Sequence, residues 1–350
     1  MSAEVKTFGA AMDGREVKKI ILENESGLKA EILTMGATVA RLWTPDSDGK
    51  LADIVLGYDT VAEYEKGTSY FGAVVGRVGN RIANGRYERN GVTYSLSKNE
   101  KGVQTLHGGG AFHLKLWDIE SLDDADKPSV LLRVQSPDGE DGFPGNLTAW
   151  ARYTVTKNEL VIEYRAVGDK ETPINLTNHS SFNLSGFDGP NILEHELTLC
   201  ADKLTEIDEN LIPTGRHLPV QGTPFDFTAP KQIGRDIDSD DAQIRLGGGY
   251  DHNFVLGEPG AMRLMARLYE PRSGRVMETF TDRAGVQFYT NNITDETVKG
   301  KDGVPVRRHS ACCLETQEIP DAVNHSEFPS IFYQPGQEYR AKTVYRFSAE

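Results

Sequence analysis

The feature that most constrains the fold of this chain is an alternation of side-chain character with a period of two. It is clearest in LVIEYRAV at residues 160–167 and in YRAKTVYRF at residues 339–347. A period of two places successive side chains on opposite faces of a β-strand, so these segments predict strands of a sheet whose two faces differ. Similar strand-like segments lie at residues 17–23, 28–33, 131–135 and 286–289.

Turn residues between these segments indicate antiparallel pairing. In GRYERNGVTYSLS, residues 85–97, Asn90 and Gly91 separate two strand-like runs. This pair supplies the positive φ angles of a type I′ turn, which predicts a β-hairpin. Glycine and proline recur between the other short segments, as expected for strands joined by turns.

Helix signals are few. TVAE at residues 60–63 has the pattern of a capping box, and Gly67 closes that short element. We find no internal repeat and no linker that would divide the chain. We therefore expect an all-β fold with few short helices, a large antiparallel β-sandwich formed as a single domain over residues 1–350. Two stacked sandwiches are the alternative.

The net charge of −14 constrains the partners. A negative field of this size repels phosphate backbones and anionic lipid surfaces, so we expect no nucleic acid and no membrane partner. A neutral ligand would not feel that field. The first residues lack the apolar region of a secretory signal, and no apolar run approaches the roughly 18 residues of a spanning helix. We expect a cytoplasmic protein.

Cysteine usage and the known cofactor motifs point to neither a metal nor a cofactor. Cys312 and Cys313 are adjacent, which fits neither a disulfide framework nor a C-x-x-C metal site. We interpret them, with Cys200, as small buried apolar residues. The glycine-rich stretches lack the lysine and hydroxyl of a P-loop, and no H-E-x-x-H zinc motif occurs.

One candidate for chemistry is Glu315 in ACCLETQEIPDAVNH. The apolar run at residues 311–314 predicts a buried strand, and Glu315 follows it directly. A carboxylate in such a place is partly desolvated, which raises its pKa and suits it to act as a general base. The alternative is a structural ion pair between Glu315 and Arg307 or Arg308 across a sheet edge.

A second candidate is His179, in the dense polar stretch TNHSSFNLSG at residues 177–186. An imidazole titrates near neutrality, so it can give or take a proton. Its polar neighbours are suited to fix the tautomer and the orientation of the ring. The alternative is a histidine that is satisfied in the core or in a turn.

Five further residues are candidates for binding a ligand. His107 precedes glycines that allow a close approach of the backbone, and Asn80 and Arg81 are adjacent donors suited to hydroxyl groups. Asp251 precedes an apolar strand, and Gln287 lies inside one. For His107 the alternative is a hairpin turn, and for Asn80 and Arg81 it is a loop cap beside a surface charge. For Asp251 it is an Asx turn, and for Gln287 it is a polar side chain on a solvent-facing strand.

Taken together, these segments resemble the aldose 1-epimerase (galactose mutarotase) family. The resemblance extends in order along nearly the whole chain, through GRVGNRIANGRY, LHGG, NLTNHSSFNLSG, GTPFDF, GYDHNFVL, VQFYT, LETQEIPDAVNH and PGQEYRAKTVYRF. It implies a galactose mutarotase-like β-sandwich with an open cleft on one sheet. It also implies the interconversion of the α and β anomers of free aldohexoses such as galactose and glucose, in a monomer or a homodimer.

The resemblance also implies roles for the candidate residues. Glu315 matches the general base of the family, and His179 matches its general acid. The positions that hold the sugar hydroxyls are matched by Asn80, Arg81, His107, Asp251 and Gln287. Proton transfer of this kind would need no metal and no cofactor.

This chain departs from the family pattern at two positions, and three alternatives to the family's activity are considered. The family usually has tyrosine where this chain has Ser181, and glycine where it has Asn291. One alternative is a hexose-6-phosphate mutarotase, for which Arg77 and Arg81 could bind the phosphate. Another is a non-catalytic sugar-binding protein on the same fold; a β-sandwich without a ligand ranks last.

Overall fold

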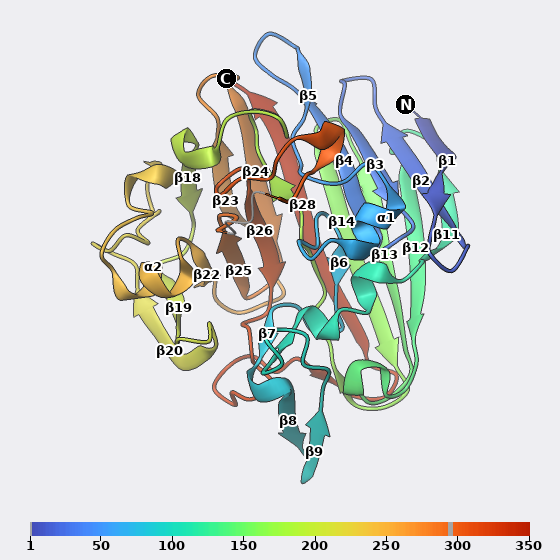
Figure 1. Cartoon of the computed structure of the whole chain (residues 1–350), viewed down its shortest axis with the longest axis vertical. Coiled ribbons are helices and arrows are strands. Elements are labelled where there is room, and N and C mark those ends of the chain that lie inside the picture. The colour runs from blue at the N-terminus through green and yellow to red at the C-terminus, as the bar shows by residue number, and fades with distance from the viewer. Residues whose placement is uncertain (1, 293–296) are drawn as a thin grey trace.

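Antiparallel sheets dominate the computed structural model, which describes residues 2–292 and 297–350 (Figure 1). The largest sheet has nine strands in the order β11 (Asp118–Asp123), β12 (Ser129–Ser136), β13 (Leu147–Val155), β14 (Glu159–Gly168), β28 (Glu338–Ala349), β24 (Arg275–Thr281), β23 (Arg263–Tyr269), β18 (Glu196–Leu199) and β21 (Lys231–Gln232). A six-stranded sheet has the order β17 (Ser181–Phe182), β26 (Cys312–Gln317), β25 (Gly285–Tyr289), β22 (Asp251–Val255), β19 (Lys203–Ile207) and β20 (Pro213–Pro219).

The remaining strands form smaller sheets. The N-terminal sheet consists of β1 (Ser2–Ala10), β2 (Glu16–Glu23), β3 (Lys29–Leu33), β4 (Thr38–Pro45) and β5 (Leu51–Asp53). The two-stranded pairs are β6 (Val74–Val75) with β16 (Thr177–Asn178), β7 (Arg81–Ile82) with β10 (Thr105–Leu106), β8 (Arg86–Arg89) with β9 (Val92–Ser95), and β15 (Thr172–Pro173) with β27 (Phe332–Tyr333).

Helices are short and peripheral. The α-helices of the described residues are α1 (Val61–Lys66) and α2 (Ala242–Gly247). The 3-10 helices are η1 (Ala83–Gly85), η2 (His107–Gly109), η3 (Phe112–Leu114), η4 (Glu140–Gly142), η5 (Ile192–Glu194), η6 (Ile233–Arg235) and η7 (Lys301–Gly303). Throughout the described part of the chain, every helix is too short or too polar to cross a bilayer.

The expected strands and turns are confirmed. Both alternating segments lie in the centre of the nine-stranded sheet, where β14 pairs with β13 on one side and with β28 on the other. The predicted hairpin is β8–β9, and its turn residues Asn90 and Gly91 have φ angles of 53° and 77°. It projects at the lower end of the molecule (Figure 1). Helix α1 has the capping box, with reciprocal hydrogen bonds between Thr60 and Glu63.

The core lies between the nine-stranded sheet and the two other large sheets. Strand β2 packs on β13 and β4 packs on β28, and buried side chains of all three sheets form one continuous apolar cluster. Ile20, Ile162 and Phe288 are fully buried members of it. Each such side chain contributes roughly 1.5–3 kcal/mol by leaving water. This packing of sheet on sheet is the expected β-sandwich.

The six-stranded sheet presents two chemically different faces. Along β25, Val286 and Phe288 lie in the core, while Gln287 between them faces a cavity on the other side. Along β26, Leu314 lies in the core and Glu315 faces the same cavity. Because Gln287 is the register partner of Glu315, the two polar side chains are neighbours on that face. The pleat thus places a polar site directly above the apolar core.

Candidate active site

The seven candidate residues converge on one cavity of about 230 Å³. The strand residues of the floor come from β17, β22, β25 and β26, and the other lining residues come mainly from residues 68–107. The candidates that line it are Asn80, Arg81, His107, His179, Asp251, Gln287 and Glu315. A cavity of this size and polarity holds several water molecules or a small polar ligand.

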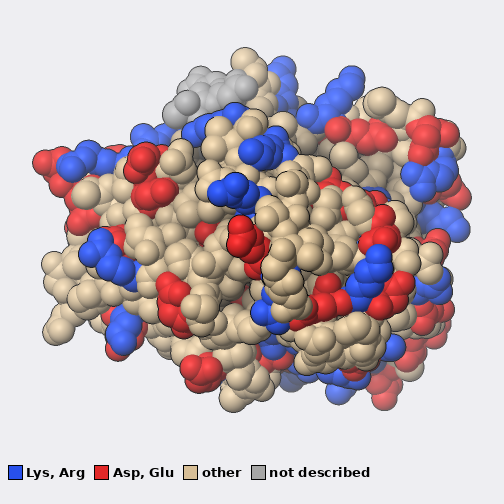
Figure 2. Space-filling model, turned by 90° about the horizontal axis from the view of Figure 1, so that it is seen from below, with Lys and Arg blue, Asp and Glu red and all other residues tan. Residues whose placement is uncertain are grey.

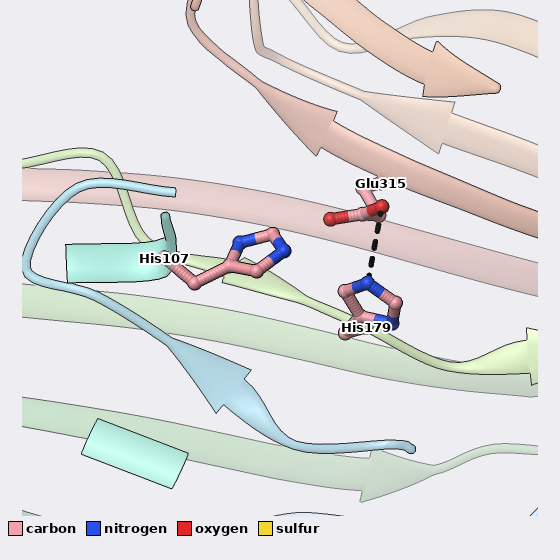
Figure 3. Close-up of side chains that lie close together, drawn as sticks. All are labelled: His107, His179 and Glu315. Atoms are coloured by element: carbon pink, nitrogen blue, oxygen red, sulfur yellow. Dashed lines mark ion pairs between the residues drawn. The ribbon is translucent and has the colours of Figure 1, made fainter. Parts of the chain in front are cut away.

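Glu315 and His179 face each other inside this cavity (Figure 3). Glu315 Oε1 lies 3.6 Å from His179 Nε2, and the two side chains are 3% and 9% exposed. The second carboxyl oxygen, Oε2, is buried and has no hydrogen-bond partner among the described residues. A buried oxygen without a partner is costly, so a ligand that donates a hydrogen bond would be bound favourably there. Among the described residues Glu315 pairs with neither Arg307 nor Arg308: Arg307 is exposed, and Arg308 reaches Gly248 O and Asp238.

Burial moves the pKa values of the two groups in opposite directions. It raises the pKa of Glu315 to about 8; the neighbouring Asp251 carboxylate adds to this rise, and Arg81 opposes it. The predicted rise is therefore confirmed. Burial lowers the pKa of His179 to about 4, partly offset by a hydrogen bond to the residue's own carbonyl. The expectation that His179 titrates near neutrality is wrong, because a low-dielectric site disfavours the charged ring.

The pair nevertheless holds one proton across a wide pH range. Between about 4 and about 8, Glu315 carries that proton and the His179 ring is neutral. Transfer of the proton from Glu315 to His179 gives a carboxylate beside an imidazolium without changing the total number of protons. The cavity can therefore contain an acid and a base at the same time over this range.

The polar stretch around His179 serves mainly to satisfy buried backbone. His179 N–H donates to Ala73 O, and Gly72 N–H donates to His179 O, both at 2.9 Å. Asn178 donates through Nδ2 to Gly72 O at 2.7 Å, and Ser180 donates to Asn178 Oδ1. These contacts fix the short segment between β16 and β17, where strand pairing stops. Within the described residues of this stretch, only His179 and Ser181 line the cavity.

His107 is held by a pair of unusual backbone conformations. Asn80 and His107 have φ angles of 62° and 50°, and Gly108 follows with 71°. A Cβ atom at Gly108 would lie 2.0 Å from Gly76 O, which explains the glycine after the histidine. Asn80 N–H donates to His107 Nδ1 at 3.1 Å, and His107 N–H donates to Asn80 O at 3.0 Å. The Nδ1 lone pair is thus occupied, so neutral His107 carries its proton on Nε2.

A third group of residues forms a polar network beside Glu315. Arg81 donates from Nε and Nη2 to the two oxygens of Glu100 at 3.0 Å, and its Nη1 lies 3.7 Å from Asp251. Gln287 Nε2 donates to Asp251 Oδ1 at 2.6 Å. Burial raises the pKa of Asp251, and Arg81 opposes that rise. The network offers fixed donors and acceptors on one wall, an arrangement suited to hydroxyl groups.

A metal ion fits this cluster poorly. One ligand atom each of His107, His179 and Glu315 lies within 4.8 Å of the others. A first-row metal with bonds of about 2.0–2.2 Å would need the three atoms closer together. In addition, a ligating nitrogen needs a free lone pair, whereas His107 Nδ1 is occupied by Asn80 N–H and Nε2 then bears hydrogen. The cluster is built to donate and accept hydrogen bonds.

Sequence reasoning missed several residues of the cavity. Tyr70 packs its ring against three imidazoles, with centroids 4.8 Å from His107, 4.6 Å from His113 and 5.8 Å from His179. Glu100, the partner of Arg81, also lines the cavity. Neither belongs to a recognisable motif, because each acts only through neighbours that folding brings to it.

One expected alternative loses its structural basis. Arg77 does not reach the cavity; it is 1% exposed and its guanidinium donates to Ser136, Thr172 and several backbone carbonyls. Arg81, its supposed partner in binding phosphate, is already paired with Glu100. The cavity wall that remains carries Asp251, whose carboxylate would repel a phosphate group.

Comparison with known proteins agrees with this site and this fold. Residues 18–346 match the family model described as aldose 1-epimerase. The chain is 44% identical to galactose mutarotase of Rattus norvegicus over 96% of this chain and 95% of that one. It is 35% identical to aldose 1-epimerase of Escherichia coli over 99% of both chains. The crystal structure of galactose 1-epimerase from Lactobacillus acidophilus superposes with a TM-score of 0.87 at 27% identity, covering 100% of this chain and 99% of that chain.

Stacked antiparallel sheets are thus common to this chain and to its solved relative. This chain belongs to the aldose 1-epimerase family. Its activity is that of an isomerase of the mutarotase type, which interconverts the two anomers of an aldose.

Proposed function

We propose that the substrates are free aldohexoses, galactose and glucose among them, and that Glu315 and His179 carry the proton transfers. The observation that supports this proposal most is the 3.6 Å approach of Glu315 Oε1 to His179 Nε2 inside a closely lined polar cavity. A cyclic hexose needs one proton removed from its C1 hydroxyl and one added to its ring oxygen. The facing pair can perform both transfers without a third group.

In the proposed reaction, ring opening begins from the Glu315 carboxylate and the His179 imidazolium. Glu315 takes the proton of the C1 hydroxyl, and His179 gives its Nε2 proton to the ring oxygen. The bond between C1 and the ring oxygen breaks, which leaves an aldehyde and a new hydroxyl group. Rotation about the C1–C2 bond exposes the other face of the aldehyde, and the two residues reverse their roles during closure.

The pKa values in the empty cavity fit one stage of this cycle. At neutral pH Glu315 is protonated and His179 is neutral, which is the form that the pair takes after ring opening. The open-chain sugar is therefore held in a cavity whose catalytic pair carries no net charge. Before opening, sugar hydroxyls that donate to the unpartnered Oε2 would stabilise the carboxylate and favour transfer of the proton to His179.

The remaining candidates are proposed to bind the sugar hydroxyls. His107 offers Nε2–H as a donor because its Nδ1 accepts from Asn80 N–H. Asp251 offers a carboxylate acceptor whose position is set by Arg81 and Gln287. A fixed orientation of the ring matters because each proton transfer requires a heavy-atom distance near 3 Å, and a well-placed transfer contributes roughly 10²- to 10⁴-fold in rate.

The partner and the location are proposed from the surface. Figure 2 shows basic and acidic residues interspersed on the face seen from below, with no broad basic area there for a nucleic acid or an anionic membrane. A small neutral sugar needs no such area. The cysteines are free thiols, which suits the proposed cytoplasmic location. We propose a monomer or a homodimer.

The decay of optical rotation of fresh α-D-galactose and α-D-glucose tests the function. The rate should exceed the buffer background with both sugars and should return close to background in Glu315→Gln and His179→Gln. Galactose 6-phosphate and glucose 6-phosphate serve as the comparison, and we expect them to react more slowly. Preferred turnover of the phosphorylated sugars would favour the phosphate-specific alternative. Binding of free sugar without any acceleration would favour the non-catalytic one.

A further inference from the structure

The adjacent cysteines of β26 have different surroundings. Cys312 lies in the apolar core, where its register partner on β17 is Phe182. Cys313 lies on the opposite face, and its register partner is Ser181. Both thiols are about 1% exposed, so burial alone does not distinguish them. The face of the strand does, because only Cys313 shares the face of Glu315.

Cys313 contacts the catalytic histidine from behind. Its sulfur lies 3.7 Å from His179 Nδ1, the nitrogen that does not face Glu315. The same sulfur lies 3.3 Å from Ser181 Oγ. His179 therefore has Glu315 at one ring nitrogen and a thiol at the other, and the thiol has a hydroxyl group beside it.

The chemistry of ring opening requires a particular tautomer of His179. After the imidazolium gives its Nε2 proton to the sugar, the neutral ring keeps its hydrogen on Nδ1. To receive the proton back, Nε2 must still present its lone pair toward the cavity. A group that accepts a hydrogen bond from Nδ1–H therefore keeps the ring ready for each cycle.

We propose that Cys313 is a positioning residue, whose sulfur accepts the hydrogen bond from His179 Nδ1–H, while its own S–H is donated to Ser181 Oγ. This inference rests on the proposed role of His179 as the acid. Ser181 then orients the thiol and leaves the sulfur lone pair for the imidazole. The carbonyl of His179, which also faces the ring, favours the same tautomer but already accepts Gly72 N–H.

A thiol suits this position better than a carboxylate. An anionic acceptor at Nδ1 would stabilise the imidazolium and raise the pKa of His179. Cys313 stays neutral, because burial and the nearby Glu315 hold its pKa well above the ordinary value. It can therefore select the tautomer without making His179 a weaker acid. Thiols are soft, weak hydrogen-bond partners, so the expected effect is moderate.

The test compares Cys313→Ala and Cys313→Ser with Cys312→Ala as the matched control. The Cys313→Ala variant should lose about five- to tenfold in kcat, as expected for one lost hydrogen bond, with KM little changed. The Cys313→Ser variant should recover most of that loss, because a hydroxyl oxygen can accept from Nδ1–H. The Cys312→Ala variant should keep the wild-type kcat.

A second readout does not depend on turnover. In ¹⁵N-histidine-labelled protein without sugar, the resonances of His179, assigned by their loss in His179→Gln, should show hydrogen on Nδ1. The Cys313→Ala variant should shift this balance toward Nε2, and the Cys312→Ala variant should not. A wild-type ring protonated on Nε2, or an equal fall of kcat in Cys312→Ala and Cys313→Ala, would overturn the proposal. If the wild-type protein had no mutarotase activity, but Cys313→Ala still lost the tautomer preference, only the proposed function would be refuted.

Discussion

Two buried acid–base pairs in this molecule are built in opposite ways. Beside the N-terminal sheet, Lys301 donates from Nζ to Asp53 at 2.5 Å, to Val55 O at 2.6 Å and to Ala40 O at 3.1 Å. Asp53 also accepts the N–H groups of Leu42 and Val55. Every N–H donor of the ammonium group thus has an acceptor. In the cavity, Glu315 and His179 approach only to 3.6 Å, and the part of the chain that the structure describes offers Glu315 Oε2 no hydrogen-bond partner.

The difference separates a structural pair from the proposed catalytic one. Asp53–Lys301 is saturated with hydrogen bonds, so it can hold η7 against the sheet but can bind nothing else. Glu315–His179 is under-satisfied, which leaves both groups able to exchange protons with a ligand. Burial shifts the pKa values of both pairs toward the neutral forms. A shifted pKa therefore does not by itself mark a catalytic group; what sets the proposed catalytic pair apart is that both of its groups line the cavity.

The largest expected effect is on catalysis, in Glu315→Gln. We expect kcat to fall by about 10²- to 10⁴-fold, because the proposed general base is lost. The raised pKa of Glu315 costs stability as the pH rises from 4.5 to about 8, so the variant should gain stability relative to wild type over that range. Polarimetry and urea unfolding at several pH values measure the two effects.

The matched control is Glu318→Gln. Glu318 is another buried carboxylate, paired with Arg283 at 2.8 Å, and it does not line the cavity. It should lose stability and keep its activity per folded molecule. If Glu318→Gln lowered kcat as much as Glu315→Gln does, the distinction between the two kinds of carboxylate would fail.

The converse experiment is Lys301→Met. Removal of the ammonium leaves buried Asp53 with only the longer ionic contact to Arg41 Nη1 at 3.5 Å, which should lower the free energy of unfolding by about 3–5 kcal/mol. The kcat of the folded fraction should not change. Lys342→Met is the control, because that lysine pairs with Glu163 at the surface and should contribute no more than about 1 kcal/mol. A loss of kcat without a loss of stability in Lys301→Met would contradict the structural assignment.

The pH dependence of kcat tests the single proton of the catalytic pair. Activity should be level between about 4 and about 8. Above this range the pair loses its only proton and has no acid; below it the pair gains a second proton and has no base. A profile measured by polarimetry, with the buffer-catalysed rate subtracted at each pH, checks both limbs. A single limb centred near pH 6.5 would mean that His179 titrates as an unperturbed histidine.

The smallest expected effect on the pH profile is a shift of its alkaline limb in Asp251→Asn. Because the Asp251 carboxylate raises the pKa of Glu315, its removal should move the alkaline limb to lower pH. It should also raise KM by roughly tenfold or more, since a charged acceptor for the sugar is lost. Asp226→Asn, at an exposed turn, is the control. An unchanged alkaline limb would show that Asp251 does not interact with Glu315.

Much of the fold was predictable because strands and turns follow from local chemistry. The alternation in β14 and β28 and the Asn90-Gly91 turn each reflect a local preference of the chain. The opposite faces of Cys312 and Cys313 were not predictable in the same way. Both lie in a continuous apolar run, so the sequence shows no alternation there, and only the structure shows that the Cys313 thiol contacts His179 and Ser181. The assignment of the whole chain to one domain stays a prediction.

The candidate site was predictable in its residues but not in its geometry. The same short motif contains Arg77 and Arg81, and sequence reasoning could assign both to a ligand. In the structure Arg77 is bound to carbonyls of a distant loop, whereas Arg81 enters the cavity. Likewise, an isolated histidine predicts titration near neutrality, but burial of the His179 ring lowers its pKa.

By itself, the sequence determined the chemical groups, the strands that carry them and the resemblance to a family, because these depend on residue types and on spacing along the chain. Only the tertiary structure decided that Glu315 meets His179, which hydrogen bonds each of them lacks, and how far burial shifts their pKa values. The reason is physical. Distance, dielectric surroundings and the supply of hydrogen-bond partners arise from segments that are remote in sequence and become neighbours only when the sheets pack.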